Sequence, residues 1–279
     1  GGQDDLKEGL IRAIGVATMR FGEDHLRMLR AVRFSAGFGF PLEHETRRAV
    51  EAMAHLVESV SPERIAAELR AMAARPGRGQ AISLLVETGL AGPVFHEFHQ
   101  HDAAFWRRAA ATVDALDEPS LPLLLAILCQ QDSAAATRLA HRLRLSNHER
   151  KLTQWLVAAE HAMSEATAAG ELAEQPWSIL QPWLGHAWRF QLADLRRAVA
   201  ATTGQGSEAA SWVSRQVTRP QVELDPAELL SGHDLLALGV PAGPDIGAML
   251  KKIRSMQLDD EVTSREEAMQ KIAAWLASG

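Results

Sequence analysis

Arginine and acidic side chains recur at helical spacing in one stretch near the N-terminus. The stretch reads RFGEDHLRMLRAVRF over residues 20–34, and its basic side chains include four arginines and no lysine. At ~100° of rotation per residue, Glu23, Arg27 and Arg30 fall on one side of a helix and the apolar residues fall on the opposite side. The spacing predicts one amphipathic helix whose polar side is built from carboxylates and guanidinium groups.

Asp24 and Arg27 are the pair on this helix with the clearest chemistry. A guanidinium is a planar donor fork that suits base edges and phosphates, and a neighbouring carboxylate adds an acceptor. Cytosine and adenine present an amino donor beside a ring-nitrogen acceptor, whereas uracil and guanine present the reverse at the same edge. The pair would therefore accept C or A and leave U or G facing unpaired groups. Ordinary ion pairs between residues three and four apart on a solvated helix explain the same spacing, so spacing alone leaves both interpretations open.

Further helices must position this stretch. Ser61-Pro62-Glu63 has the residue types of a helix start, and Ile65, Leu69 and Met72 follow on one face. The turn Arg75-Pro76-Gly77-Arg78-Gly79 ends that block. More amphipathic helices are expected at Ala81–Thr88, Ala103–Leu116, Leu121–Gln130 and Glu149–Met163, with a loop at residues 202–207. A capping box of Thr263 and Glu266 is expected to open a final helix.

Composition favours the same all-α fold. Alanine and leucine are abundant, aromatic residues make up 5% and tyrosine is absent, which favours helices over sheet. No alternation of strands and helices is apparent, so the 279 residues predict an elongated, all-α assembly of helical modules.

Charge and cysteine content exclude several classes of protein. The net charge of −6 argues against a protein that coats nucleic acid with uniform positive charge, although a local basic patch remains compatible with it. The single cysteine, Cys129, excludes an intramolecular disulfide and fits a cytoplasmic location. No apolar run approaches the ~18 residues that a membrane span needs.

Several motifs occur in an order typical of one enzyme family. They are the segment GGQDDLKEGLIR at residues 1–12, the arginine-rich stretch, Gly39-Phe40, Glu45-Thr46 and VSPERIAAEL at residues 60–69. Together they resemble the class II tRNA nucleotidyltransferase/poly(A) polymerase family, and the similarity is dense over about the first 70 residues. The resemblance implies that Asp24 and Arg27 read the base of an incoming CTP or ATP, with Glu23 buttressing Arg27.

The resemblance assigns further roles more weakly. Arg30 and Arg33 would orient the base-reading pair or contact phosphate. Asp5 and Arg12 lie in the segment that resembles the connection between head and neck, and would act as hinge or positioning residues.

Three modules are expected along the chain. Residues 1–78 would form a nucleotide-selecting neck, residues 79–217 a helical body that includes a degenerate HD-like region, and residues 218–279 a tail that contacts the tRNA elbow. In the tail, Gly243-Pro244 precedes a helix, and Lys251, Lys252 and Arg254 are the expected RNA contacts. Ordinary surface lysines explain the tail residues equally well.

The resemblance also places the catalytic head of the family upstream of these motifs. That head carries an Asp-x-Asp pair that holds Mg²⁺, and this sequence has no matching segment, so no catalytic residue and no metal ligand is expected here. His101-Asp102 and His233-Asp234 suggest an HD-type metal site, but the helix expected to end in His-Asp ends in Cys129-Gln130. The chain alone is therefore expected to be inactive.

The predicted function is CCA addition to tRNA 3′ ends by the intact enzyme, with ATP and CTP as substrates. A bacterial poly(A) polymerase shares the motifs, but such enzymes tend to be basic and this chain is acidic. The motifs are also compatible with an enzyme that adds only A or only CC. Outside this activity, a non-enzymatic helical RNA-binding scaffold and an HD-type hydrolase remain compatible with the sequence.

Overall fold

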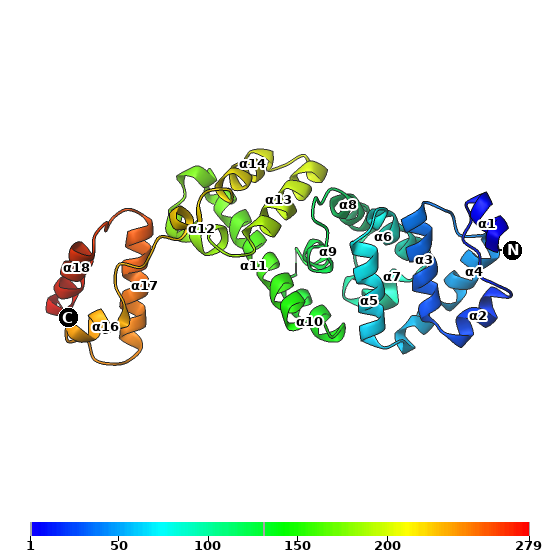
Figure 1. The fold of residues 1–279 in the computed structure, drawn as a ribbon, viewed down its shortest axis with the longest axis horizontal. Helices are drawn as coiled ribbons and strands as arrows, with labels where there is room; N and C mark the ends of the chain where they lie inside the picture. The colour runs from blue at the N-terminus through cyan, green and yellow to red at the C-terminus, as the bar shows by residue number, and fades with distance from the viewer. Residues whose placement is uncertain (1, 131, 279) are drawn as a thin grey trace. The chain divides into compact units, whose positions relative to one another are not determined.

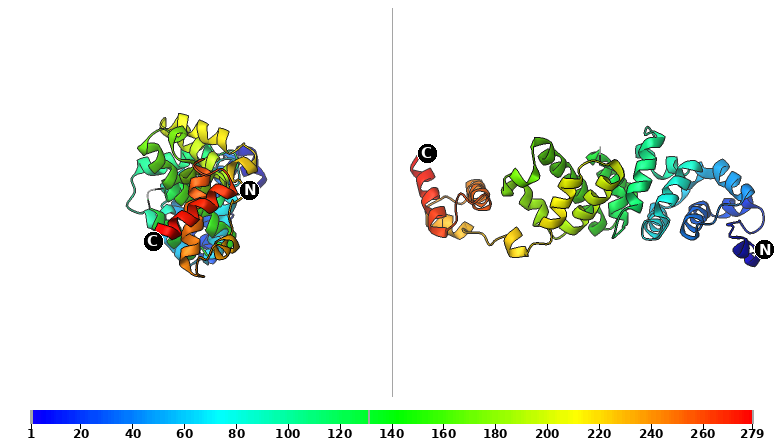
Figure 2. Two further views of the ribbon diagram at one scale, coloured as in Figure 1. Left: turned by 90° about the vertical axis from the view of Figure 1, so that its left-hand side faces the viewer. Right: turned by 90° about the horizontal axis from the view of Figure 1, so that it is seen from above.

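The computed structural model describes residues 2–130 and 132–278, and this part of the chain is helical (Figure 1). Within it the β-structure is a single isolated parallel bridge between Ile11 and Leu42. Two further views show helices joined by loops from one end of the ribbon to the other (Figure 2). The predicted all-α fold class is confirmed.

Most of the expected helices form close to their expected bounds. Those of the first part are α1 (Gly2–Glu8), α2 (Ala17–Glu23), α3 (Leu26–Phe38), α4 (His44–Met53), α5 (Pro62–Ala73), α6 (Arg78–Glu87), α7 (Ala91–Val94), α8 (Ala103–Asp114) and α9 (Leu121–Leu128). They are followed by α10 (Ser133–Arg142), α11 (Asn147–Ala169), α12 (Trp177–Leu184), α13 (Arg189–Thr203), α14 (Ser207–Gln216), α15 (Gln221–Leu224), α16 (Gly232–Ala237), α17 (Pro244–Leu258) and α18 (Arg265–Ser278). Short 3₁₀ turns lie at Ala54–Ser59, His96–Phe98 and Leu172–Glu174.

The chain divides into two compact units. Unit 1 comprises residues 1–162 and 191–210, and unit 2 comprises residues 163–190 and 211–279. These divisions differ from the expected module boundaries at 78/79 and 217/218, so the neck, body and tail remain a functional prediction.

In unit 1, α3 packs against both α5 and α6, and these helices lie side by side in Figure 1. Met28, Leu29 and Val32 of α3 are fully buried. As predicted, Ser61 precedes α5, Pro62 is in its first turn, and Ile65, Leu69 and Met72 are buried. This packing fixes the helix that begins next to Asp24.

Glycine allows α6 to approach its neighbours closely. Gly77 has φ of 78°, and a Cβ atom there would lie 2.1 Å from the Ala36 carbonyl oxygen. A Cβ atom on Gly79 would lie 2.5 Å from the Ala110 carbonyl oxygen of α8 and 2.2 Å from the Asp114 carboxylate. Any side chain at these positions would push α6 away from α3 or α8.

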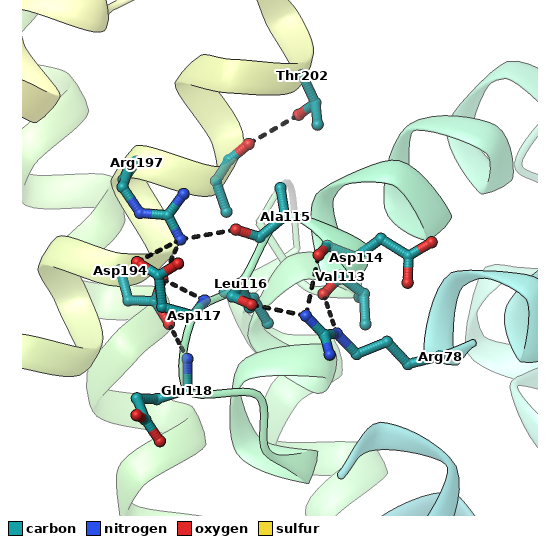
Figure 3. A network of polar contacts seen from close by, with 11 residues as sticks. Arg78, Val113, Asp114, Ala115, Leu116, Asp117, Glu118, Asp194, Arg197 and Thr202 are labelled. Atoms are coloured by element: carbon teal, nitrogen blue, oxygen red, sulfur yellow. Dashed lines mark hydrogen bonds and ion pairs between the residues drawn. The ribbon is translucent and has the colours of Figure 1, made fainter. Parts of the chain in front are cut away.

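Two arginines hold the loop that follows α8 (Figure 3). Arg78 donates to the carbonyl oxygens of Val113 at 2.7 Å, Asp114 at 2.9 Å and Leu116 at 2.6 Å. Arg197 donates to the Ala115 carbonyl at 2.6 Å. Asp194 belongs to the same helix as Arg197, and its carboxylate accepts hydrogen bonds from the backbone N–H groups of Asp117 and Glu118 at 2.9 and 3.0 Å. The carbonyl groups that a helix leaves without partners at its C-terminus are thereby satisfied by guanidinium donors.

Unit 2 has its own apolar cluster, which includes Leu235, Ile253 and Ile272 from α16, α17 and α18. The predicted capping pair of Thr263 and Glu266 is wrong by one residue. Glu267 accepts from the Thr263 backbone N–H at 2.8 Å and from its hydroxyl at 3.1 Å, because α18 begins at Arg265. None of the helices among the described residues combines the length and apolarity of a membrane span.

Candidate nucleotide-selecting site

The arginine-rich stretch does not form one helix. The prediction of a continuous helix over residues 20–34 is wrong, because α2 ends at Glu23 and α3 begins at Leu26. Asp24 is extended, with φ of −157° and ψ of 106°, and its Oδ1 accepts the backbone N–H of Leu26 at 3.2 Å. An aspartate that bonds to the backbone two residues ahead offers the chain an alternative to the helical hydrogen bond. Asp24 therefore lies at a corner between two helices.

Glu23 and Arg27 face each other across this corner. Arg27 Nη1 donates to Glu23 Oε2 at 2.5 Å and to the Arg20 carbonyl at 2.8 Å. Arg20 Nη1 also donates to Glu23 Oε2 at 2.6 Å. The hydrogen bond from Arg27 is the largest of the effects that lower the pKa of Glu23. Glu23 is therefore ionised and holds one edge of the Arg27 guanidinium, leaving the Nε and Nη2 donors for another acceptor.

A residue far along the chain holds Asp24. Arg64, in the first turn of α5, donates from Nη2 to Asp24 Oδ2 at 2.7 Å. This hydrogen bond is the main cause that lowers the pKa of Asp24, and the charge of Arg27 contributes in the same direction. The Asp24 side chain is 29% exposed and that of Arg27 is 34% exposed. An ionised acceptor and a guanidinium donor thus lie next to each other, partly open to solvent.

The sequence does not predict Arg64 as a residue of this site. Ser61-Pro62-Glu63 indicates a helix start, but nothing in its spacing links the next residue to one 40 positions earlier. Only the packing of α5 against α3 brings Arg64 and Asp24 together.

Arg30 and Arg33 lie farther along α3 and differ in environment. Arg30 is exposed, and its guanidinium lies 5.9 Å from the centre of the Phe34 ring. Arg33 donates from Nε to Glu68 Oε2 at 2.6 Å in a pair whose side chains are only 12% and 11% exposed. Arg33 thus joins α3 to α5, and its side chain is less accessible to a nucleotide than that of Arg27.

Asp5 and Arg12 do pair with each other. Arg12 Nε lies 2.9 Å from Asp5 Oδ1, which joins α1 to the segment that follows it. That segment is held against the start of α4, where the Ala13 N–H donates to Thr46 Oγ1 at 3.0 Å. The pair fixes the course of the chain before α2, in keeping with a positioning role.

The three predicted tail residues lie in different surroundings on α17. Lys252 lies 4.0 Å from the centre of the Trp275 ring, and Arg254 donates to Asp225 at 2.6 Å. Lys251 is exposed and lines a cavity together with Leu229 and Arg254. Lys252 is exposed as well, whereas the side chain of Arg254 is only 18% exposed.

The described residues do not offer the ligands of a metal centre. They contain no group of three or more His, Cys, Asp or Glu side chains that could hold a metal ion. His101 instead stacks on Phe105 at 4.0 Å, and Asp234 accepts from Ser231 and Arg265. This part of the chain does not fit a Mg²⁺ site, and no chemical step is assigned to a metal here.

Known proteins resemble the chain in sequence and in fold. Residues 39–101 match a family described as the probable RNA and SrmB-binding site of polymerase A. The CCA-adding enzyme of Lactobacillus gasseri is 30% identical over 271 residues, which cover 96% of this chain and 64% of that protein. The CCA-adding enzyme of Geobacillus thermodenitrificans is 30% identical over 282 residues, which cover 99% of this chain and 65% of that protein.

Solved structures agree on the fold. The CCA-adding enzyme of Bacillus stearothermophilus in complex with CTP gives a TM-score of 0.63 at 24% identity, over 100% of this chain and 68% of that one. The Thermotoga maritima CCA-adding enzyme complexed with tRNA gives a TM-score of 0.66 at 20% identity, over 99% of this chain and 66% of that one. The chain is thus similar over nearly all of its length to CCA-adding enzymes of the tRNA nucleotidyltransferase/poly(A) polymerase family. It spans about 64% of the length of the first curated relatives that it matches.

Proposed function

We propose that this chain selects the nucleotide and binds tRNA in an enzyme that adds CCA to tRNA 3′ ends from CTP and ATP in the cytoplasm. The observation that carries the proposal is that an ionised acceptor, Asp24, feels the charge of a donor fork, Arg27, while each is held by a separate partner. The curated relatives named above are CCA-adding enzymes, which supports this choice within the family.

Selection follows from the hydrogen-bonding groups of the pair. Asp24 accepts from the exocyclic amino group of cytosine or adenine, and Arg27 donates to the neighbouring ring nitrogen. Uracil or guanine in the same place would set a carbonyl against the Asp24 carboxylate and an N–H against the Arg27 donors. Leaving such groups unpaired costs about 1–3 kcal/mol each. The site therefore reads C and A as one class.

The partners of the pair make this selection possible. Glu23 holds Arg27 by one nitrogen, so the remaining donors keep a fixed direction. Arg64 holds Asp24 by one oxygen, so the remaining lone pairs of the carboxylate also keep a fixed direction. Groups fixed before the nucleotide arrives lose little freedom when it binds, which favours affinity and specificity.

We further propose that the transfer reaction uses Mg²⁺ held by a separate head domain. Bound Mg²⁺ would neutralise charge on the nucleotide phosphates. The contribution of this chain is to orient the base and hold the RNA. On its own it is expected to transfer no nucleotide.

The test is incorporation of labelled CTP, ATP, UTP and GTP into tRNA that lacks its CCA end, by the chain joined to a catalytic head. Arg27→Ala is compared with wild type, and Arg47→Ala is the matched control. Arg47 also bonds to a glutamate four residues away, Glu51, at 2.9 Å, but it lies on α4 outside the site. We expect ordered C, C, A addition by wild type and by the control, and a loss of preference for CTP and ATP of roughly 10- to 100-fold in Arg27→Ala.

The outcomes separate the competing functions. If wild type makes only long A tails, the chain belongs to a poly(A) polymerase, an interpretation that the match of residues 39–101 also supports. If Arg27→Ala keeps its nucleotide preference, the base-reading role is wrong. If wild type adds no nucleotide, the result favours a non-enzymatic RNA-binding scaffold over an enzyme.

A further inference from the structure

A basic cavity of about 530 Å³ lies within unit 1, and none of the predicted site residues lines it. Four of its lining side chains are His141, Arg142, Arg144 and Arg150, and Pro62 closes one side. They come from the end of α10, the turn that follows it, the first turn of α11 and the start of α5. Three arginines around one open cavity make a site for an anion.

Two of the arginines are held in place by carboxylates. Arg142 donates from Nε and Nη2 to the two oxygens of Glu97 at 2.8 Å, and Nη2 also donates to the Val94 carbonyl at 2.7 Å. Arg144 donates to Glu63 at 2.6 Å, and its backbone has φ of 48°, in the left-handed region that non-glycine residues seldom adopt. The turn is therefore built to present Arg144 beside the cavity, at a conformational cost that its neighbours must offset.

Arg150 differs from both. Its side chain makes a long hydrogen bond, 3.3 Å, to the uncharged side-chain oxygen of Asn147. Among the described residues no carboxylate lies within ion-pair distance of it. The cavity therefore has about one positive charge that the chain does not neutralise.

The first turn of α5 connects this cavity to the base-reading pair. Pro62 lines the cavity, Glu63 bonds to Arg144, and Arg64 bonds to Asp24. One helical turn rises only about 5.4 Å. Successive residues of one helical turn thus contact the cavity and Asp24, so one RNA strand could contact both.

We propose that this Arg144/Arg150 cavity binds a backbone phosphate of the RNA strand that is being extended. The inference rests on the proposed function. A phosphodiester carries one negative charge, which matches the single uncompensated charge of Arg150. A nucleotide triphosphate carries several and would leave most of them unpaired here. The cavity thereby sets where the RNA 3′ end lies relative to Asp24 and Arg27.

The experiment measures binding of the 279-residue chain to fluorescently labelled tRNA that lacks its CCA end, by anisotropy at several salt concentrations. Arg150→Gln is compared with wild type and with Arg75→Gln. Arg75 is an exposed arginine just past the far end of α5, roughly 20 Å along the helix from Pro62. Within the described ranges it too has no carboxylate at ion-pair distance, so the two variants remove the same kind of charge.

We expect Arg150→Gln to weaken tRNA binding about tenfold and to reduce the slope of log affinity against log salt by about one. The tRNA affinity of Arg150→Lys should lie between those of Arg150→Gln and wild type, because lysine keeps the charge and loses the planar pair of donors. Arg75→Gln should bind as wild type does. Circular dichroism melting of each variant establishes that the fold is intact.

Equal tRNA affinity of wild type and Arg150→Gln would overturn the proposal. A loss of CTP or ATP affinity with unchanged tRNA affinity would assign the cavity to the nucleotide triphosphate and would overturn it as well. If the folded wild-type chain does not bind tRNA, the proposed function fails first and the cavity proposal fails with it. Parallel titrations with labelled tRNA and with labelled CTP or ATP distinguish the three results.

Discussion

At the scale of single residues, the two halves of the base-reading pair differ in how far the sequence predicts them. The spacing of four residues predicts a contact of Glu23 with Arg27 on one helix, and the contact forms although α2 and α3 are separate helices. The contact of Asp24 with Arg64 spans 40 residues and depends on how α5 packs. Local spacing carries no information about such a partner. The sequence therefore predicts Asp24, Arg27 and the contact of Glu23 with Arg27, but not the contact of Arg64 with Asp24.

Arg64→Gln tests the importance of this distant partner. Without the Arg64 hydrogen bond the Asp24 carboxylate keeps only the weak bond from the Leu26 N–H and can rotate. We expect preference for CTP and ATP over UTP and GTP to fall about tenfold, less than in Arg27→Ala, because the acceptor is loosened and not removed. The measurement is the ratio of kcat/KM values for the four nucleotides.

Arg47→Gln is the control for the loss of an exposed, carboxylate-bound arginine in the same unit. A purely structural role for Arg64 would lower all four rates together and leave their ratios unchanged. That pattern would contradict the positioning role.

At the scale of helices, residue types predict the interior of each element better than its ends. The helix start at Ser61 and Pro62 is correct because the φ of proline is fixed near the helical value and its missing N–H loses no hydrogen bond in the first turn. The break at Asp24 escapes prediction because the apolar period runs through it, and the nearby Gly22 lies inside α2 and not at its end. The bond from Leu26 to the Asp24 side chain ends the helix there, and it becomes visible only in the structure.

Close approach of helices gives a second prediction, for Gly79→Ala. The new Cβ atom would lie 2.5 Å from the Ala110 carbonyl oxygen, so α6 or α8 must shift. Overpacking of this kind costs about 1–3 kcal/mol. Gly92→Ala in α7 is the control, because nothing lies within 4 Å of the Cβ atom that it adds. Urea unfolding that is unchanged in Gly79→Ala would show that α6 and α8 do not approach this closely.

The start of α16 gives a prediction that depends on pH. Hydrogen bonds from Arg265, first, and from Ser231 lower the pKa of Asp234 below its ordinary value. A carboxylate whose pKa is lower in the folded state stabilises that state above the unfolded pKa of about 3.9, and the contribution is lost as the pH falls below it. Asp234→Asn should therefore unfold at a lower urea concentration than wild type at pH 7.

The difference between Asp234→Asn and wild type should shrink as the pH is lowered from about 5 to 3. Glu228→Gln removes an exposed acid of the same unit and should show no such trend. A difference that stays constant over this pH range would mean that the Asp234 carboxylate does not carry the contribution.

At the scale of the whole molecule, composition and periodicity predict the fold class, and the resemblance predicts the family. Neither predicts where the chain divides into units. The division passes through helices such as α11, where residue 162 belongs to one unit and residue 163 to the other. Helical periodicity reports which side of a helix is buried and is silent about which partner buries it. The same limit explains why the sequence does not predict the Arg144/Arg150 cavity, in which Pro62 of α5 lies beside residues 140–150.

The proposed RNA contacts of the two units give the last prediction. Arg150 lies in unit 1 and Lys251 in unit 2, and neither shares a partner with the other. Substitutions at independent sites usually change free energy additively. If the tail contacts the tRNA elbow, as its resemblance to the family implies, Arg150→Gln and Lys251→Gln should weaken binding of full-length tRNA by factors that multiply. A minihelix limited to the acceptor arm should be weakened only by Arg150→Gln. Loss of minihelix affinity in Lys251→Gln would place Lys251 on the acceptor arm, because the elbow is absent from that RNA.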